Sequence, residues 1–199
     1  METASKFGKR NKFRKEPLIT PLFKKGDRRS CENYRGIALL DVTYKLLASI
    51  IKRRLEGYME EALGEYQGGF RNGRGTTDQI FILKQIMVGN YEYESPTHLL
   101  LVDFKRAYDT VNRTKLINIL RELDIPEKLI NLIKMTLKNT ISRVKVKGKT
   151  SDSFNVKQGL RQGDLLSTTL FNLVLESIIK KSDINRKGLL FNTSHQCLA

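Results

Sequence analysis

One aspartate in this sequence stands where metal chemistry could occur. Asp103 follows the apolar run 99–102, which is typical of a buried strand. A carboxylate buried there would lose its hydration, which is unfavourable for its charged form. A bound Mg²⁺ would compensate for that cost, with the Asp103 carboxylate and the Phe104 carbonyl as its oxygen ligands. The residue types therefore allow metal-assisted phosphoryl transfer. The commoner alternative is an aspartate that caps the following turn, and Asp109 is expected to bond nearby backbone or to pair with Arg113.

A glycine-rich segment offers a second candidate contact. Residues 67–75 contain four glycines and two arginines, Arg71 and Arg74. Four glycines in nine residues permit positive φ angles and close backbone approach, so amides and guanidinium groups could contact phosphate oxygens. The segment lacks the Gly-Lys-Ser/Thr ending of a P-loop. An exposed turn is an equally good explanation of the same residues.

The segment 159–164 is a third candidate, because it is polar, contains glycine and leads into an expected helix. Gln162 could present its amide to a ribose or a base edge, and the helix amino terminus behind it favours anions. The alternative is a simple capping loop in which Asp164 caps the helix.

Alternating helical and strand-like patterns would have to position these residues. The sequence predicts strands at 18–23, 34–40, 98–104, 144–147, 153–156 and 189–191. It predicts helices at 43–63, 76–87, 112–123 with Asn112 as the cap, 126–138 and 165–181. The first helix is expected to bury Leu47, Ile50, Ile51, Leu55, Tyr58, Met59 and Leu63, and to end in a left-handed cap at Gly64. This order, without a parallel βαβ rhythm, predicts an α+β fold.

The charge of the chain favours a polyanionic partner. The formal net charge is +15, and residues 1–54, with 15 Lys/Arg and 5 Asp/Glu, carry +10 of it. Neutralised phosphates release counterions, so nucleic acid suits such a field. A membrane surface is the weaker alternative, because these residues have a strand-and-loop pattern and not that of one basic amphipathic helix.

The cysteines and the hydropathy of the chain indicate the cellular compartment in which the protein is expected. Cys31 and Cys197 lie far apart, without metal-ligand spacing, and are expected to be free thiols in a reducing compartment. No apolar run is long enough to span a bilayer, and no apolar segment follows the basic stretch 6–15 as it would in a secretory signal. We therefore expect an intracellular protein with no membrane partner.

Four blocks of the chain, taken in order, resemble those of reverse transcriptases. They are 33–40 (NYRGIALL), 67–79 (QGGFRNGRGTTDQ), 102–109 (VDFKRAYD) and 161–167 (RQGDLLS). The likeness is greatest to the RNA-directed DNA polymerases of retrotransposons without long terminal repeats, and it spans residues 17–199. It implies a right-hand polymerase: residues 1–16 a basic flexible lead-in, 17–97 a fingers-like region, and 98–199 a partial palm.

The resemblance also implies roles for single residues. Asp103 would be the first catalytic carboxylate and, with Phe104, a ligand of Mg²⁺ or Mn²⁺. Tyr108 matches the aromatic residue that meets a ribose 2′-hydroxyl. The other positions that match nucleotide-binding residues are Lys24, Lys25, Arg35, Phe104, Gln162 and Gly163, and those that match template-binding residues are Arg71 and Arg74. The implied partners are an RNA template, a DNA primer and deoxynucleoside triphosphates, in the nucleus or the cytoplasm with the element's RNA.

Members of that family carry an aromatic-x-Asp-Asp hairpin after a stretch like 194–199. We therefore expect the second catalytic motif and the thumb to be missing from these 199 residues, and the strand near 195 to lack a hairpin partner. Two-metal nucleotidyl transfer is expected of the complete enzyme, and no measurable polymerisation of this chain alone. The alternatives are a catalytically dead remnant that only binds RNA or DNA, and an RNA-binding module unrelated to polymerases.

Overall fold

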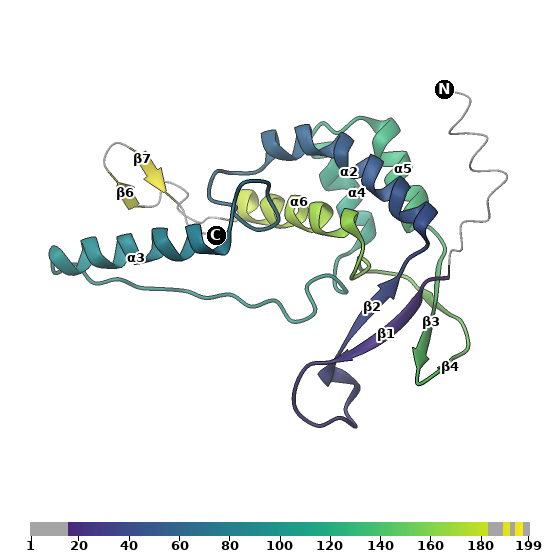
Figure 1. The fold of residues 1–199 in the computed structure, drawn as a ribbon. Coiled ribbons are helices and arrows are strands. Elements are labelled where there is room, and N and C mark those ends of the chain that lie inside the picture. Colours follow the sequence, from purple (N-terminus) through teal and green to yellow (C-terminus); the bar gives the residue numbers. More distant parts are fainter. Residues whose placement is uncertain (1–15, 183–188, 192–193, 197–199) are drawn as a thin grey trace.

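The computed structural model describes residues 16–182, 189–191 and 194–196 (Figure 1). The expected lead-in lies outside this part except for Glu16, and Cys197 lies outside it as well. The helices are α2 (Val42–Ala62), α3 (Thr76–Glu92), α4 (Arg113–Glu122), α5 (Glu127–Leu137) and α6 (Leu165–Lys181), and a 3-10 turn spans Cys31–Asn33. The strands are β1 (Leu18–Phe23), β2 (Tyr34–Leu39), β3 (Thr140–Val146), β4 (Lys149–Thr150), β5 (Phe154–Val156), β6 (Leu189–Phe191) and β7 (Ser194–Gln196).

The main sheet is mixed and is built from two hairpins that the sequence predicts. β1 and β2 pair antiparallel from Leu18↔Leu39 to Phe23↔Tyr34. β1 also pairs parallel with β3, through Leu18↔Arg143 and Ile19↔Val144. β4 and β5 both pair antiparallel with β3. The parallel β1–β3 contact therefore joins two hairpins that lie about 120 residues apart in the sequence.

The hydrophobic core lies among α2, α4, α5 and α6, above the sheet in Figure 1. The largest fully buried apolar side chains in it are Ile51, Leu55, Leu116, Leu120, Ile130, Ile133, Leu166, Leu170 and Leu173. The prediction of the buried face of α2 is partly wrong, because Ile50 and Tyr58 are exposed. The buried stripe runs instead through Tyr44, Ala48, Ile51, Leu55 and Met59, since α2 packs along one narrow line against its neighbours.

Helix boundaries agree with most of the expected start signals. The Asn112 side chain accepts hydrogen bonds from the amides of Thr114 and Lys115, and so caps α4 as predicted. The prediction of a left-handed cap at Gly64 is wrong, because Gly64 has no positive φ and Leu63 ends α2 in an extended conformation. A Cβ on Gly64 would lie 2.3 Å from the Tyr66 ring, so glycine is needed there for close packing.

The segment 98–104 differs most from its prediction, because it is neither a strand nor buried. Its residues have no regular structure, and Leu100 and Leu101 are each 88% exposed. An apolar run forms a buried strand only when neighbouring strands satisfy its backbone and other elements cover its faces. In the described part of the chain, β6 and β7 pair with each other and the five-stranded sheet does not include this segment.

Two further elements depart from expectation. α3 is five residues longer than the predicted helix, which ended at 87, and it points away from the other four helices (Figure 1). Ile86 is its one buried residue. The expected absence of a partner for the strand near 195 is wrong, because β7 pairs antiparallel with β6 through Leu190↔His195.

The part that the structure describes thus combines five α-helices with a mixed sheet. The expectation of a fold that mixes helices and sheet is confirmed at that level. No helix among these residues is both long enough and apolar enough to cross a membrane.

Candidate active site

The segment 104–111, which follows Asp103, is held against the loop that precedes α6. The Gly159 amide donates to the Val111 carbonyl and the Leu160 amide donates to the Tyr108 carbonyl, both at 2.8 Å. Gly159 has φ +81°, and a Cβ there would lie 2.7 Å from the Asp109 carbonyl oxygen. Only glycine allows both the positive φ and this approach, so its position fixes the two candidate segments side by side.

Two aromatic side chains of that segment pack on α6. The Tyr108 ring lies 5.1 Å from the Phe171 ring, and the Phe104 ring lies 6.4 Å from it in an edge-on arrangement. Phe171 is partly buried on the core, so both rings are tied to the helical layer. Partial burial raises the pKa of the Tyr108 hydroxyl, which stays protonated at neutral pH.

The loop 159–164 is joined in turn to β2. The Ala38 amide donates to the Gln162 carbonyl at 2.9 Å. Gly163, with φ +99°, brings its backbone so close that a Cβ would lie 3.1 Å from the Ala38 carbonyl oxygen. A small cavity of about 300 Å³ opens at this junction, lined in part by Gly36, Asp109 and Gln162. Three sequence blocks therefore meet here: β2, the segment after Asp103, and the loop before α6.

A buried polar network holds the far end of that loop. The Tyr44 hydroxyl of α2 donates to the Asp164 carboxylate at 2.5 Å, and Asp164 accepts from the Leu166 amide as the cap of α6. The Arg161 guanidinium lies 5.0 Å over the Tyr44 ring. Burial, and then the charge of Asp164, raise the pKa of Tyr44, so this hydroxyl remains a donor. The predicted Asp164 cap is confirmed.

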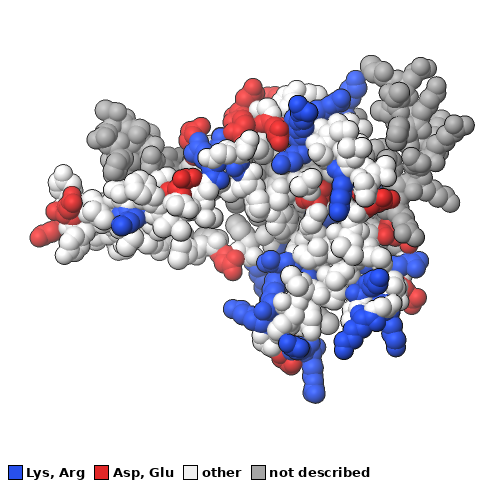
Figure 2. All heavy atoms as spheres, in the orientation of Figure 1, with Lys and Arg blue, Asp and Glu red and all other residues white. Residues whose placement is uncertain are grey.

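The basic candidates near the N-terminus lie on the surface. Lys24 and Lys25 are exposed in the loop between β1 and β2, and Arg35 is exposed on β2. Figure 2 shows Lys and Arg side chains gathered over this loop and over the neighbouring β3–β4 hairpin. Arg106 reaches the same region, with its guanidinium 3.6 Å from Glu32. A cluster of positively charged side chains thus covers one end of the sheet on the face shown.

The two arginines of the glycine-rich loop are occupied within the chain. Arg71 is 8% exposed, donates to the Gly64 carbonyl at 2.8 Å, and pairs with Glu60 at 2.6 Å. Arg74 pairs with Glu65, and this hydrogen bond and charge hold the pKa of the Glu65 carboxyl below its usual range. Both guanidinium groups therefore stabilise the fold of the loop, and neither is left open for a phosphate in this structure.

Asp103 belongs to no cluster of metal ligands in the described residues. It lies in the exposed segment 98–104, and no group of three His, Cys, Asp or Glu in the described residues could hold a metal ion. Its carboxylate and the Phe104 carbonyl are oxygen donors of the kind that Mg²⁺ prefers. One carboxylate and one carbonyl do not complete an octahedral site, so the described residues fit a divalent ion only in part.

Sequence reasoning did not predict how two residues organise this region. Arg113 donates to the carbonyls of Leu137, Val156 and Gly159 at 2.8 to 2.9 Å, and so ties α5 and β5 to the candidate loop. Pairing with Arg113 was one of two alternatives expected for Asp109, and it does not occur, because the guanidinium is directed at these carbonyls. The second residue is Tyr44. Its helical spacing with Ala48 could have predicted that it is buried, but nothing in the sequence indicates its distant partner Asp164.

Comparison with known proteins is consistent with this assembly. The family model "Reverse transcriptase (RNA-dependent DNA polymerase)" matches residues 23–190. The Retrovirus-related Pol polyprotein from type-1 retrotransposable element R2 of Popillia japonica is 29% identical over 157 residues, which are 78% of this chain and 22% of that protein.

Two further relatives extend the comparison. The probable RNA-directed DNA polymerase from transposon BS of Drosophila melanogaster is 28% identical over 72% of this chain and 16% of its own length. The Transposon TX1 uncharacterized 149 kDa protein of Xenopus laevis is 26% identical over 81% of this chain and 12% of its own length. The chain thus spans less than a quarter of each relative, and enzymes of this family depend in general on divalent metal ions. With most of its length matched by the family model, the chain belongs to the reverse transcriptases, among those of retrotransposons without long terminal repeats.

Proposed function

We propose that this chain forms the nucleotide-binding part of an RNA-directed DNA polymerase, which extends a DNA primer on an RNA template with deoxynucleoside triphosphates. One observation carries the proposal: β2, the segment 104–111 and the loop 159–164 are joined by backbone hydrogen bonds at the Gly159 and Gln162 positions. These are three of the blocks that resemble reverse transcriptases. In this proposal residues 17–97 form the fingers and residues 98–199 part of the palm.

The proposed roles follow from the chemistry of each side chain. Tyr108, whose ring is fixed on Phe171, is suited to meet the sugar of an incoming nucleotide. Gln162 and Gly163 would contact that nucleotide from the loop. Lys24, Lys25 and Arg35 would hold the triphosphate, because all three are exposed cations. Arg71 and Arg74 would support the template through the shape of the loop 67–75, since both guanidinium groups already have partners.

Asp103 would hold Mg²⁺ or Mn²⁺, with the Phe104 carbonyl as a further oxygen donor. When bound, such an ion would stabilise negative charge on the reacting phosphate. The protein residues have separate tasks: Tyr108 orients the sugar and the Gln162 loop positions the base. Template pairing would choose the base, so the chain needs contacts to the backbone more than to base edges.

Primer extension tests the proposal. The source transcript is first sequenced past the codon for Ala199, and the product of any longer open frame is assayed on an RNA template with a DNA primer. We expect extension by the longer protein that is lost in Asp103→Asn, and no measurable extension by the 199-residue chain. Extension that survives Asp103→Asn would contradict the role of this carboxylate.

A second candidate function rests on a different observation. Asp103 has no carboxylate cluster around it among the described residues, whereas exposed lysines and arginines cover one end of the sheet. A catalytically dead remnant that only binds RNA or DNA would have these properties. Salt-sensitive binding together with inactivity of every longer product would favour it over the polymerase.

A further inference from the structure

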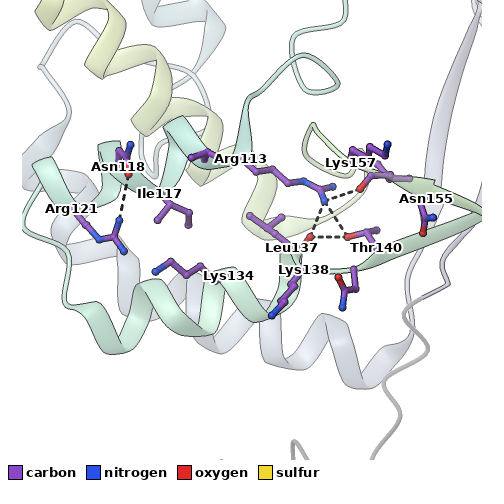
Figure 3. A pocket seen from close by; sticks show the side chains of 13 residues that line it. Arg113, Ile117, Asn118, Arg121, Lys134, Leu137, Lys138, Thr140, Asn155 and Lys157 are labelled. Atoms are coloured by element: carbon purple, nitrogen blue, oxygen red, sulfur yellow. Dashed lines mark hydrogen bonds between the residues drawn. The ribbon is translucent and has the colours of Figure 1, made fainter.

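A basic pocket borders the junction cavity, but none of the residues proposed above for nucleotide or template lines it. It is an open pocket of about 810 Å³ between α4, α5 and the residues around β5 (Figure 3). Arg113 and Arg121 of α4, Lys134 of α5, and Lys138 and Lys157 beyond the helix and strand ends line it. The lining contains five cationic side chains and no Asp or Glu.

Among the described residues, three of the five cationic side chains have no carboxylate partner. Glu127, outside the lining, lies 2.9 Å from Arg121 and 4.0 Å from Lys134, and so neutralises part of one wall. Lys138 and Lys157 are exposed and, within the part of the chain that the structure describes, make no ion pair. Their ammonium groups are free to move toward a ligand, which makes them the accessible contacts of the pocket.

Arg113 adds a fixed charge at the inner wall. Its guanidinium donates to three backbone carbonyls, its Nη2 is buried without a partner, and no carboxylate in the described residues pairs with it. Burial, and then the nearby charge of Arg161, lower the pKa of Arg113, but arginine stays charged at neutral pH. A negative group in the pocket would offset this uncompensated charge.

The composition of the walls indicates the chemistry of the ligand. No aromatic side chain lines the pocket, so it offers no platform on which a base could stack. Asn118, Asn139 and Asn155 supply amides that can donate to phosphate and sugar oxygens. Cationic side chains from α4, α5 and the end of β5 offer several separate contacts, which suit the successive phosphates of a strand. We propose that this pocket docks the phosphodiester backbone of a nucleic-acid strand, without sequence preference and through residues other than those proposed for catalysis.

The test removes the two accessible lysines from the full chain. Binding of a single-stranded RNA and of a single-stranded DNA of the same sequence is measured over a range of salt for wild type and for the double variant Lys138→Ala/Lys157→Ala. We expect weaker binding at low salt and a dependence of log K on log salt that is shallower by about 1.4, because each phosphate that a lysine no longer neutralises changes the slope by about 0.7. Equal effects on RNA and DNA would identify the phosphodiester as the group recognised.

A matched control removes the same charge from the two helices that border the pocket. Lys115 of α4 and Lys128 of α5 are exposed and do not line the pocket, so Lys115→Ala/Lys128→Ala should keep the wild-type salt dependence. Equally weakened binding in the two double variants would overturn the proposal. Full competition by inorganic phosphate at the same phosphate concentration would overturn it too, because that result marks a small-anion site. The readout is binding, so failure of polymerisation leaves this test intact.

Discussion

At the scale of single residues, the Asp164 carboxylate is tightly constrained. It is 7% exposed and gains two hydrogen bonds, one from the Tyr44 hydroxyl and one from the Leu166 amide. A buried carboxylate that loses a donor keeps its desolvation cost without the compensating bond. Because Asp164 follows Gln162 and Gly163 directly, the Tyr44 donor also fixes the loop that we propose to contact nucleotide.

Tyr44→Phe should therefore destabilise the protein. Removing the hydroxyl leaves Asp164 short of a buried donor, which costs about 1–3 kcal/mol in the free energy of unfolding. Urea unfolding of the two proteins measures it. Tyr34→Phe is the matched control, because the Tyr34 hydroxyl donates to the Arg28 carbonyl on the exposed surface. A destabilisation by Tyr34→Phe as large as that by Tyr44→Phe would contradict the special role of the buried bond.

The same variant predicts a dependence on pH. The pKa of Tyr44 is higher in the folded protein than in the unfolded chain, so the stabilisation is fully present below the unfolded pKa, about 10. Above that pH the unfolded chain ionises first, and stability falls until the folded pKa is passed. The stability advantage of wild type over Tyr44→Phe should thus shrink as the pH rises beyond about 10. A constant difference would contradict the raised pKa.

At the scale of elements, Gly159 joins the segment after Asp103 to the loop before α6. Gly159→Ala should cost about 1–2 kcal/mol for the positive φ, and more because its Cβ would meet Asp109 backbone. Gly148→Ala is the matched control, since Gly148 also has φ +81° and nothing lies within 4 Å of its Cβ. Urea unfolding should show the larger destabilisation for Gly159→Ala, and equal effects would mean that the close approach adds nothing.

Elements whose signals are local could be predicted from the sequence. α6 has the expected bounds because Asp164 caps it and its apolar period is regular. Segment 98–104 could not be predicted, because a strand depends on partners and the sequence does not record whether they are present. The site follows the same rule: Asp164 was expected as a cap, whereas its donor Tyr44 lies 120 residues away.

At the scale of the whole molecule, apolar surface is distributed unevenly. The helical layer buries its large side chains, whereas residues 99–102 and α3 leave theirs in contact with water. Leu100 and Leu101 are 88% exposed, and Ile80 of α3 is 67% exposed. A contiguous apolar stretch with unpaired backbone is a template for pairing between chains, so this region should dominate self-association.

The double variant Leu100→Lys/Leu101→Lys should reduce that association. Neither side chain is buried, so we expect an unchanged free energy of unfolding, while two added charges oppose contact between chains. Light scattering over a concentration series would measure the onset of association, with Leu46→Lys as the control, because Leu46 is a 63% exposed leucine in regular helix α2. If Leu46→Lys were as effective, net charge alone would explain the effect. If the double variant lost stability, the segment would have to be packed in solution, as the sequence predicted.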